Sequence, residues 1–363
     1  MIAGLIAQGK CVCWIRNTVS DVLAAHAHFA AELDDEHLFV FHARFALGDR
    51  LAIEERILAH FGKSSTPALR KGRLVIASQV AEQSLDADWD VMISDLAPID
   101  RLIQRAGRLQ RHPRSADGAR LSDPRAADER GQACLWVFGP AWTESPSANW
   151  FKQAFPKAAT VYPHHGQLWL TARALKSGQI SMPEDARQLI ESVFGREVEL
   201  PAGLQANANQ ADGSYFSDLR AAQQNTIKFA DGYVRGGFDW WSEAKTPTRL
   251  GEPSVTVVLA RWDGDQLRPW IDDEHPDRAW ANSSVRMAER LIARRASGKT
   301  PVREQAIHDL EATLPDKGQW SVLLPLSNTE SGWIGEAETH AREGKPGTTC
   351  RWRYDRASGL SML

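Results

Sequence analysis

Cysteine is scarce in this sequence, and its spacing fits no metal site. The four cysteines are Cys11, Cys13, Cys134 and Cys350, which is not a zinc-binding pattern. Cys11 and Cys13 on one strand would point to the same face, because side chains alternate along a strand. We therefore expect reduced, buried thiols in a cytoplasmic protein.

The chain also lacks a long apolar run, a leader and a marked excess of charge. No apolar stretch is long enough to cross a bilayer, and the first residues, MIAGLIAQGKCVCW, do not have the layout of a signal peptide. We therefore expect no membrane partner. The formal net charge is −3 over 363 residues, so any nucleic-acid binding must come from local basic patches.

A complete phosphate-binding loop is missing as well. Gly62-Lys63-Ser64 and Gly298-Lys299-Thr300 resemble the end of such a loop, but Ile57 and Ala293 occupy the position of its earlier glycine. Neither segment follows a strand, and no acidic Walker B box is present. The lone His308-Asp309 dipeptide lacks further metal ligands. We expect no metal to be bound by this chain itself.

Apolar strands alternate with amphipathic helices over the first 140 residues. This alternation predicts an α/β fold with a parallel sheet, whose functional loops follow the carboxyl ends of the strands. A helix capped by Ser20-Asp21 follows the first strand. Further helices are expected over Asp49–Phe61 and Ile99–Ala106. The expected strands are Cys11–Ile15, His37–His42, Leu74–Ala77, Val91–Ser94 and Cys134–Phe138.

The later part of the chain has weaker patterns. We expect residues 1–140 to form the parallel-sheet lobe, 141–250 a mostly helical linker with a polar break over Ala206–Gly213, and 251–363 a small α+β accessory domain. Arg351–Tyr354 alternates as an edge strand would. Strands are expected over Ser254–Trp262 and Trp320–Leu326, and helices over Gln167–Lys176, Glu184–Phe194, Tyr215–Phe229, Ser284–Ala296 and Val302–Thr313.

The stretch Leu74–His112 contains the most informative motif, Gln104-x-x-Gly107-Arg108-x-x-Arg111. Guanidinium groups bind phosphate oxygens in forked, charge-assisted pairs and keep their charge in any surroundings. The motif therefore suits the terminal phosphates of a nucleotide. The alternative is an arginine-rich helix end that binds nothing.

These residues resemble a known family. Residues 1–140 are similar to the second RecA-like lobe, of the P-loop NTPase type, of a superfamily two helicase. The segment SQVAEQSLDADWDVMISDLAPIDRLIQRAGRLQRH, together with WIRNTV and FHARF, resembles the large helicase/nuclease of type I CRISPR systems. TRLGEPSVTVVLAR fits the start of that family's C-terminal domain, which follows a helical linker.

The resemblance implies a motor for CRISPR antiviral defence. In that family an HD nuclease domain and a first RecA-like lobe precede this region, a Cascade complex recruits the enzyme, and ATP drives 3′-to-5′ movement on single-stranded DNA. We expect ATP with magnesium to be shared with the missing first lobe. The chain then looks truncated or split, and is not expected to hydrolyse ATP alone.

The resemblance also gives roles to the motif. Arg108 and Arg111 would be catalytic arginine fingers, which contribute about 10³–10⁵ in rate in related systems. Gln104 and Gly107 would complete the ATP site. Asp86 would lie near the ribose or couple the two sites, unless it caps a helix.

Arg105 is assigned to the same ATP site, but it could instead pair with an acidic neighbour. The remaining assignments concern DNA. Ser78, Gln79 and Val80 would touch the DNA backbone through a hydroxyl and main-chain N–H groups, and Ser78 stands where the family usually has threonine. Asn17, Thr18 and Arg44 also follow strands and could face the DNA, although Asn-Thr after a strand is equally a turn.

Two other functions remain open. The chain could be a non-enzymatic module that docks on Cascade or clamps single-stranded DNA, or it could be a gene remnant. Trp240-Trp241 and Trp262 could stack on unpaired bases, while packing in a small domain is the alternative use of tryptophan.

Overall fold

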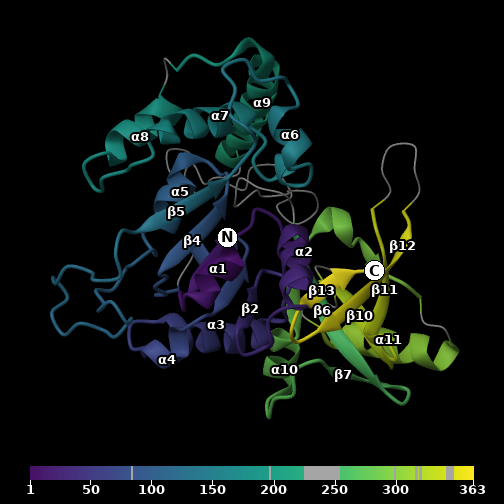
Figure 1. Ribbon diagram of the computed structural model, residues 1–363. Coiled ribbons are helices and arrows are strands. Elements are labelled where there is room, and N and C mark those ends of the chain that lie inside the picture. The colour runs from purple at the N-terminus through teal and green to yellow at the C-terminus, as the bar shows by residue number, and fades with distance from the viewer. Residues whose placement is uncertain are drawn as a thin grey trace, which may run out of the picture. The chain divides into compact units, whose positions relative to one another are not determined.

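The computed structural model describes residues 1–82, 85–195, 198–224, 254–297, 300–314, 318, 321–340 and 347–363. The chain divides into two compact units, one made of Met1–Phe138 with Pro253–Leu363, the other of Gly139–Glu252 (Figure 1). Trp240 and Trp241 lie outside the described residues. The division into three domains stays a prediction.

A parallel five-stranded sheet forms the centre of Met1–Phe138. The strand order is β2-β3-β1-β4-β5, and every neighbouring pair is parallel. This arrangement confirms the α/β fold, RecA-like in topology, that the apolar runs predicted. The strands are β1 Val12–Ile15, β2 Leu38–Phe41, β3 Leu74–Ala77, β4 Val91–Asp95 and β5 Cys134–Phe138.

Hydrophobic side chains cover both faces of this sheet. In β2, Phe39 and Phe41 pack into one core while Leu38 and Val40 pack into the other, as the pleat of a strand requires. Thr18 caps α2, because its hydroxyl accepts from Asp21 N–H at 3.1 Å; the predicted cap at Ser20-Asp21 was wrong. The helices are α1 Ile2–Ala7, α2 Val19–Phe29, α3 Leu47–Phe61, α4 Pro67–Arg70, the 3-10 turn η1 Gln79–Glu82 and α5 Ile99–Ala106.

Residues 254–363 form a second, mixed sheet. Its main path is β13-β12-β11-β10-β6-β7, with β8 beside β6 and β9 beside β11. Among the described strand pairs of this sheet, only β6 and β10 run parallel. The strands are β6 Ser254–Asp263, β7 Gln266–Pro269, β8 Ser284–Ala288, β9 Arg294–Arg295, β10 Ser321–Thr329, β11 Gly332–Glu338, β12 Thr349–Asp355 and β13 Gly359–Met362. The helices are α10 Pro276–Asn282, the 3-10 turn η5 Glu289–Leu291 and α11 Pro301–Thr313.

Two predictions in this part were wrong. Ser284–Ala296 is not a helix, because Val285 and Met287 alternate into the core and pair along β6 as strand β8. Arg351–Tyr354 is a strand, but it lies between β11 and β13 and so is not an edge. The helix predicted at Val302–Thr313 is confirmed as α11.

The other unit is helical in its described part. The expected polar break at Ala206–Gly213 was wrong, because this segment lies inside α9, where Leu204 and Ala208 are buried one turn apart. The helices are α6 Trp150–Ala154, η2 Ala158–Thr160, α7 His165–Ala174, η3 Leu175–Ser177, α8 Ala186–Phe194 and α9 Ala202–Gln224.

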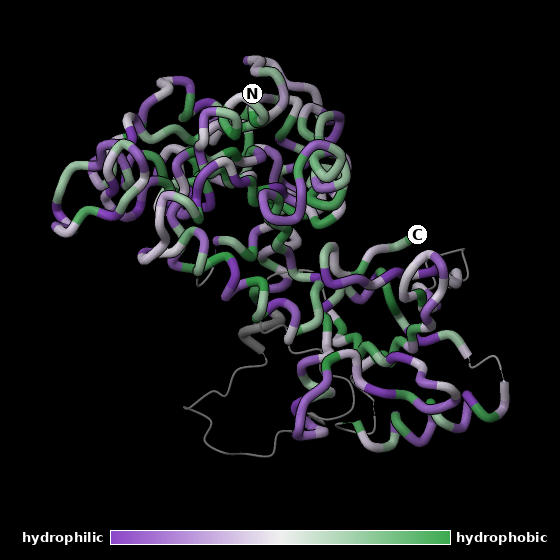
Figure 2. Tube along the Cα trace, turned by 60° about the horizontal axis from the view of Figure 1, so that its bottom comes forward, coloured by the Kyte–Doolittle hydropathy of each residue, from purple (hydrophilic) through white to green (hydrophobic). Residues whose placement is uncertain are grey.

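Hydrophobic and hydrophilic residues interleave along the traced chain, as Figure 2 shows. Within the described ranges, no helix is both long enough and apolar enough to cross a membrane.

Candidate functional site

Polar residues meet where β1, β3 and β4 end. Gln79 Nε2 donates to the Asn17 carbonyl at 2.7 Å, and Asn17 N–H donates to Asp95 Oδ2 at 3.1 Å. Arg16 Nε reaches the same Asp95 oxygen at 2.9 Å. The carboxyl ends of these strands therefore share one edge, as the sequence predicted.

Several side chains that were expected to contact DNA instead make contacts within the protein. The buried Asn17 side chain donates from Nδ2 to the Leu96 carbonyl at 2.8 Å, and Thr18 caps α2. Ser78 is buried, and Val80 packs against the core. Arg44 follows β2 at the same edge, since Ser78 N–H donates to the carbonyl of Phe41, the last residue of β2. Main-chain groups of this edge are thus better placed than most of its side chains to meet a ligand.

Arg105 lies at the centre of this edge and is fully buried. Its guanidinium forms an ion pair with Glu82 at 2.6 Å and donates to Ser94 Oγ at 2.6 Å. It also donates to the Asp95 carbonyl at 3.1 Å and to Asn17 Oδ1 at 3.5 Å. These contacts support the second of the two expected uses of Arg105, an ion pair with an acidic neighbour.

Arg108 is half-buried at the turn after α5. Its Nη1 donates to the Gln104 carbonyl at 3.0 Å, whereas its buried Nε has no hydrogen-bond partner among the described residues. Burial and the neighbouring Arg111 guanidinium lower the pKa of Arg108, although arginine remains charged. Gln104 and Gly107 are exposed beside it. A guanidinium with one unsatisfied N–H group, next to a second guanidinium, suits an anion with several oxygens.

Arg111 is held by an exposed carboxylate. Its Nε lies 2.8 Å from Asp86 Oδ1, and His112 Nε2 lies 3.0 Å from the same oxygen. The Arg111 and Asp86 side chains are 43% and 51% exposed, so this pair is weak and exchangeable. None of the described helices begins at Asp86, so it is not a helix cap.

The arginine turn and the polar edge lie at opposite ends of β4. Arg105 contacts Ser94, near the carboxyl end of β4. At the other end, the Arg108 carbonyl accepts from Trp89 N–H at 3.1 Å, and Arg111 N–H donates to Asp88 Oδ1 at 2.9 Å. Asp88 and Trp89 lie just before the first residue of β4. Glu82 in η1 pairs with Arg105 in α5, and α5 leads into the arginine turn.

A buried ion cluster fixes the chain around the arginine turn. Asp88 binds Arg114 at 2.6 Å and Arg130 at 3.2 Å, and Asp90 binds Arg70 at 2.9 Å. Burial alone would raise the pKa of Asp90, but Arg70 and hydrogen bonds from Cys11 N–H and from the Arg70 and Arg130 guanidinium groups outweigh it and lower the pKa to about 2. The cluster contacts the arginine turn directly, because Asp88 also accepts from Arg111 N–H.

Sequence reasoning missed Glu82, Asp95 and His42, all of which are buried. Glu82 lies within the SQVAEQSLD motif, which was the one available signal. In the part of the chain that the structure describes, no group of three or more His, Cys, Asp or Glu side chains could hold a metal ion.

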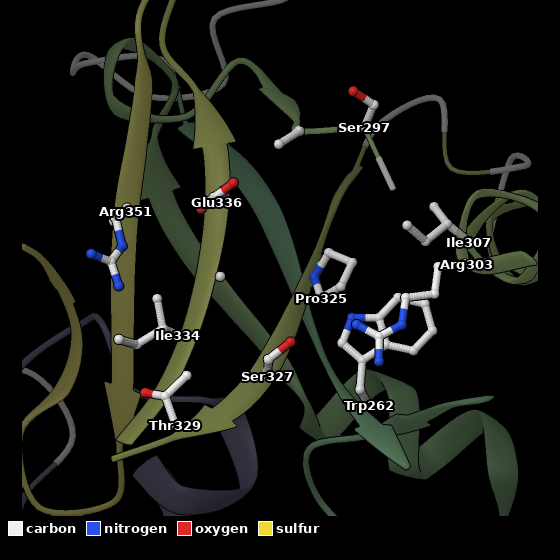
Figure 3. A pocket seen from close by; sticks show the side chains of 12 residues that line it. Trp262, Ser297, Arg303, Ile307, Pro325, Ser327, Thr329, Ile334, Glu336 and Arg351 are labelled. Atoms are coloured by element: carbon white, nitrogen blue, oxygen red, sulfur yellow. The ribbon is translucent and has the colours of Figure 1, made fainter. Parts of the chain in front are cut away.

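A separate pocket of about 130 Å³ opens on the C-terminal sheet. Figure 3 shows Trp262 and Arg303 on one side and Arg351 on the other. The Arg303 guanidinium carbon lies 4.6 Å from the Trp262 ring centre. Ser327 and Thr329 add hydroxyl groups to the lining.

Comparison with known proteins shows what this chain is similar to. Residues 8–114 match the family model "CRISPR-associated nuclease/helicase Cas3, C-terminal". The chain is similar to the C-terminal part of Cas3. The CRISPR-associated endonuclease/helicase Cas3 of Escherichia coli strain K12 is 32% identical over 267 residues, which is 71% of this chain and 27% of that protein. The Cas3 of Thermus thermophilus is 32% identical over 237 residues, which is 64% of this chain and 21% of that protein.

Solved structures extend the likeness to nearly the whole chain. The crystal structure of T. fusca Cas3-AMPPNP has a TM-score of 0.71 and 25% identity, and the match covers 98% of this chain and 39% of that one. A CRISPR RNA-guided surveillance complex, pre-nicking, has a TM-score of 0.66 at 24% identity, covering 99% and 41%, and shows the fold alone. The chain thus spans between a fifth and two fifths of these relatives. The predicted resemblance and the two-sheet fold class are confirmed.

Proposed function

We propose that this chain supplies the second RecA-like half of an ATP-dependent motor, which moves 3′-to-5′ along single-stranded DNA in type I CRISPR interference. The observation that carries the proposal is the pair Arg108 and Arg111, with the buried Arg108 Nε lacking a partner in the described chain. A Cas3-like lobe presenting this pair suits the terminal phosphates of a nucleotide.

In this proposal the two arginines make different contacts before a nucleotide binds. Arg108 is held in place by burial and by the Gln104 carbonyl, so it is ready to stabilise charge on the transferred phosphoryl group. Arg111 is held through its Nε by the exposed Asp86 carboxylate, and its terminal Nη groups are assigned to a phosphate oxygen. Asp86 thus orients Arg111, which differs from a contact with the ribose.

Another part of the motor must supply the rest of the ATP site. The sequence holds no complete phosphate-binding loop. Among the described residues, no group of three or more His, Cys, Asp or Glu side chains could hold a metal ion by itself, whereas magnesium at a nucleotide site is commonly held by one or two carboxylates together with the phosphates. We therefore assign the metal and the phosphate loop to a first RecA-like lobe, which accompanies the HD nuclease domain in the family, and expect no ATP turnover from this chain alone.

We assign DNA contact to the carboxyl end of β4, at the opposite end of this strand from the arginine turn. The first N–H groups of a short helical turn have no partner within that turn, so those of Gln79 and Val80 in η1 suit phosphate oxygens of a strand. The Glu82–Arg105 pair connects this turn to α5, which leads into the arginine turn. Recruitment by a Cascade complex belongs to the same proposal.

The proposal is tested by ATP turnover with and without a first lobe. The purified chain is compared with a fusion that places an HD nuclease domain and a first RecA-like lobe before it, each with and without oligo-dT. We expect no turnover from the chain alone and DNA-stimulated turnover from the fusion. Turnover by the chain alone, or a folded fusion without DNA-stimulated turnover, overturns the proposal.

A second candidate function is a non-catalytic clamp on single-stranded DNA, favoured by the Trp262–Arg303 pocket (Figure 3). An aromatic ring beside a cation is a sequence-tolerant stacking platform for bases. If this is the principal function, Trp262→Ala weakens oligo-dT binding while Arg108→Ala leaves turnover of the fusion unchanged. A chain that neither binds DNA nor complements turnover would be a remnant.

A further inference from the structure

The loop between β2 and α3 is held by the last strands of the chain. His42, the first residue after β2, is fully buried, and its ring stacks on Phe45 with centroids 4.4 Å apart. His42 Nε2 lies 3.0 Å from the Ser358 carbonyl, which comes from the turn between β12 and β13. The two contacting segments are 316 residues apart in sequence.

The hydrogen bonds of His42 determine its tautomer. A carbonyl oxygen can only accept, so Nε2 carries the proton and donates to Ser358, while Nδ1 accepts from Arg44 N–H at 3.1 Å. The Arg44 carbonyl accepts from Leu360 N–H in β13 at 2.8 Å. Both backbone polar groups of Arg44 are therefore fixed, one through His42 and one directly by the C-terminal strand.

Gly359 allows this close approach. Its φ is +67°, and a Cβ there would lie 2.6 Å from the Arg44 carbonyl oxygen and 2.9 Å from His42 Cε1. Any other side chain would be strained in this conformation and would push the loop away. The contact between the turn and the loop thus depends on the absence of a side chain at position 359.

A second anchor lies at the other end of the loop. The buried Tyr354 hydroxyl accepts from Ala46 N–H at 2.8 Å and donates to Asp49 Oδ2 at 2.7 Å. Trp270 Nε1 donates to the same carboxylate oxygen at 2.8 Å. Burial and the Asp49 carboxylate raise the pKa of Tyr354, so the hydroxyl keeps its proton and donates. Residues 354–360 therefore hold both ends of the loop.

We propose that residues 354–360 position Arg44 to bind a backbone phosphate of single-stranded DNA. His42, Tyr354 and Gly359 are positioning residues that act through Arg44. Arg44 lies at the same edge as Ser78 and Gln79, because Ser78 N–H donates to the Phe41 carbonyl at 2.9 Å. The C-terminal sheet is then part of the DNA-binding edge. This inference rests on the proposed function only in taking single-stranded DNA as the ligand.

The test is a double-mutant cycle in oligo-dT binding by this chain, measured at several salt concentrations. We expect Arg44→Ala to weaken binding roughly tenfold and to reduce the salt slope by about 0.7, the value for one phosphate of a single strand. Tyr354→Phe and Gly359→Ala each weaken binding in the wild-type background. Neither should weaken it further when Arg44 is already alanine.

Controls separate positioning from loss of fold. Tyr215→Phe, at an exposed position of α9, should leave binding unchanged, and thermal unfolding shows that each variant is folded at the assay temperature. Additive losses in the cycle, or unchanged binding in Arg44→Ala, overturn the inference. Because the readout is DNA binding, this failure is distinct from loss of the proposed ATP site, which is read by turnover.

Discussion

The Arg105 guanidinium lies 2.6 Å from Glu82 Oε1, and the two side chains are 0% and 1% exposed. This buried pair joins α5, which leads into the arginine turn, to η1, which begins at the polar edge of the sheet. A buried charge without its partner is unfavourable, so the two elements are obliged to move together. The pair therefore links the end of β4 that we propose faces the nucleotide to the end that we propose binds DNA.

Removing one member of this pair should destabilise the lobe strongly. We expect Glu82→Ala or Arg105→Ala to lower the free energy of unfolding by roughly 3–5 kcal/mol, because each leaves an uncompensated buried charge. Urea unfolding measures this change. Glu54→Ala is the matched control, since its pair with Arg50 is partly exposed, at 24% and 36%, and should contribute about 1 kcal/mol or less. A change below about 1 kcal/mol at Glu82 would contradict the linking role.

The sequence predicted the parallel sheet well, and the reason is visible in its strands. Runs such as Leu74–Ala77 and Val91–Ile93 are buried at every position, so their continuous apolar character is a strong local signal. The helix wrongly expected at Ser284–Ala296 shows the opposite case. There, the strand consists of only a few alternating residues, whose burial depends on pairing with β6.

The candidate site was predictable in its motif but not in the roles of its residues. Arg105 and Arg108 belong to one pattern, yet the structure buries one against Glu82, 23 residues away, and leaves the other with an unsatisfied Nε. No local pattern indicates that partner. The contact between His42 and Ser358 is likewise determined by tertiary packing alone.

Stability should fall in mild acid because of His42. Burial and the Arg44 charge lower its pKa from 6.5 to about 3, so the unfolded chain binds a proton at a pH where the folded chain does not. The contribution is fully present above about pH 6.5 and is lost as pH falls toward 3. We expect unfolding free energy, measured in urea from pH 7.5 to 4.5, to decline less steeply in His42→Gln. Parallel curves for the two proteins would show that His42 is not held neutral.

Asp86 should affect turnover more than nucleotide binding. In the fused motor, we expect Asp86→Asn to lower kcat with little change in KM for ATP, because Arg111 loses the group that orients it. Unfolding free energy should change by less than about 1 kcal/mol, as the pair is exposed. An increase in KM with kcat retained would instead place Asp86 on the nucleotide itself.

The most direct test of the account is Arg108→Ala in the fused two-lobe motor, with DNA-stimulated ATP turnover and oligo-dT affinity measured on the same preparation. Arg125→Ala, an exposed arginine outside the motif, is the control. The account predicts that turnover falls by about 10³ or more, while DNA affinity is retained because the strand is bound at the other end of β4. Unchanged turnover, or an equal loss of turnover and DNA affinity, would contradict it.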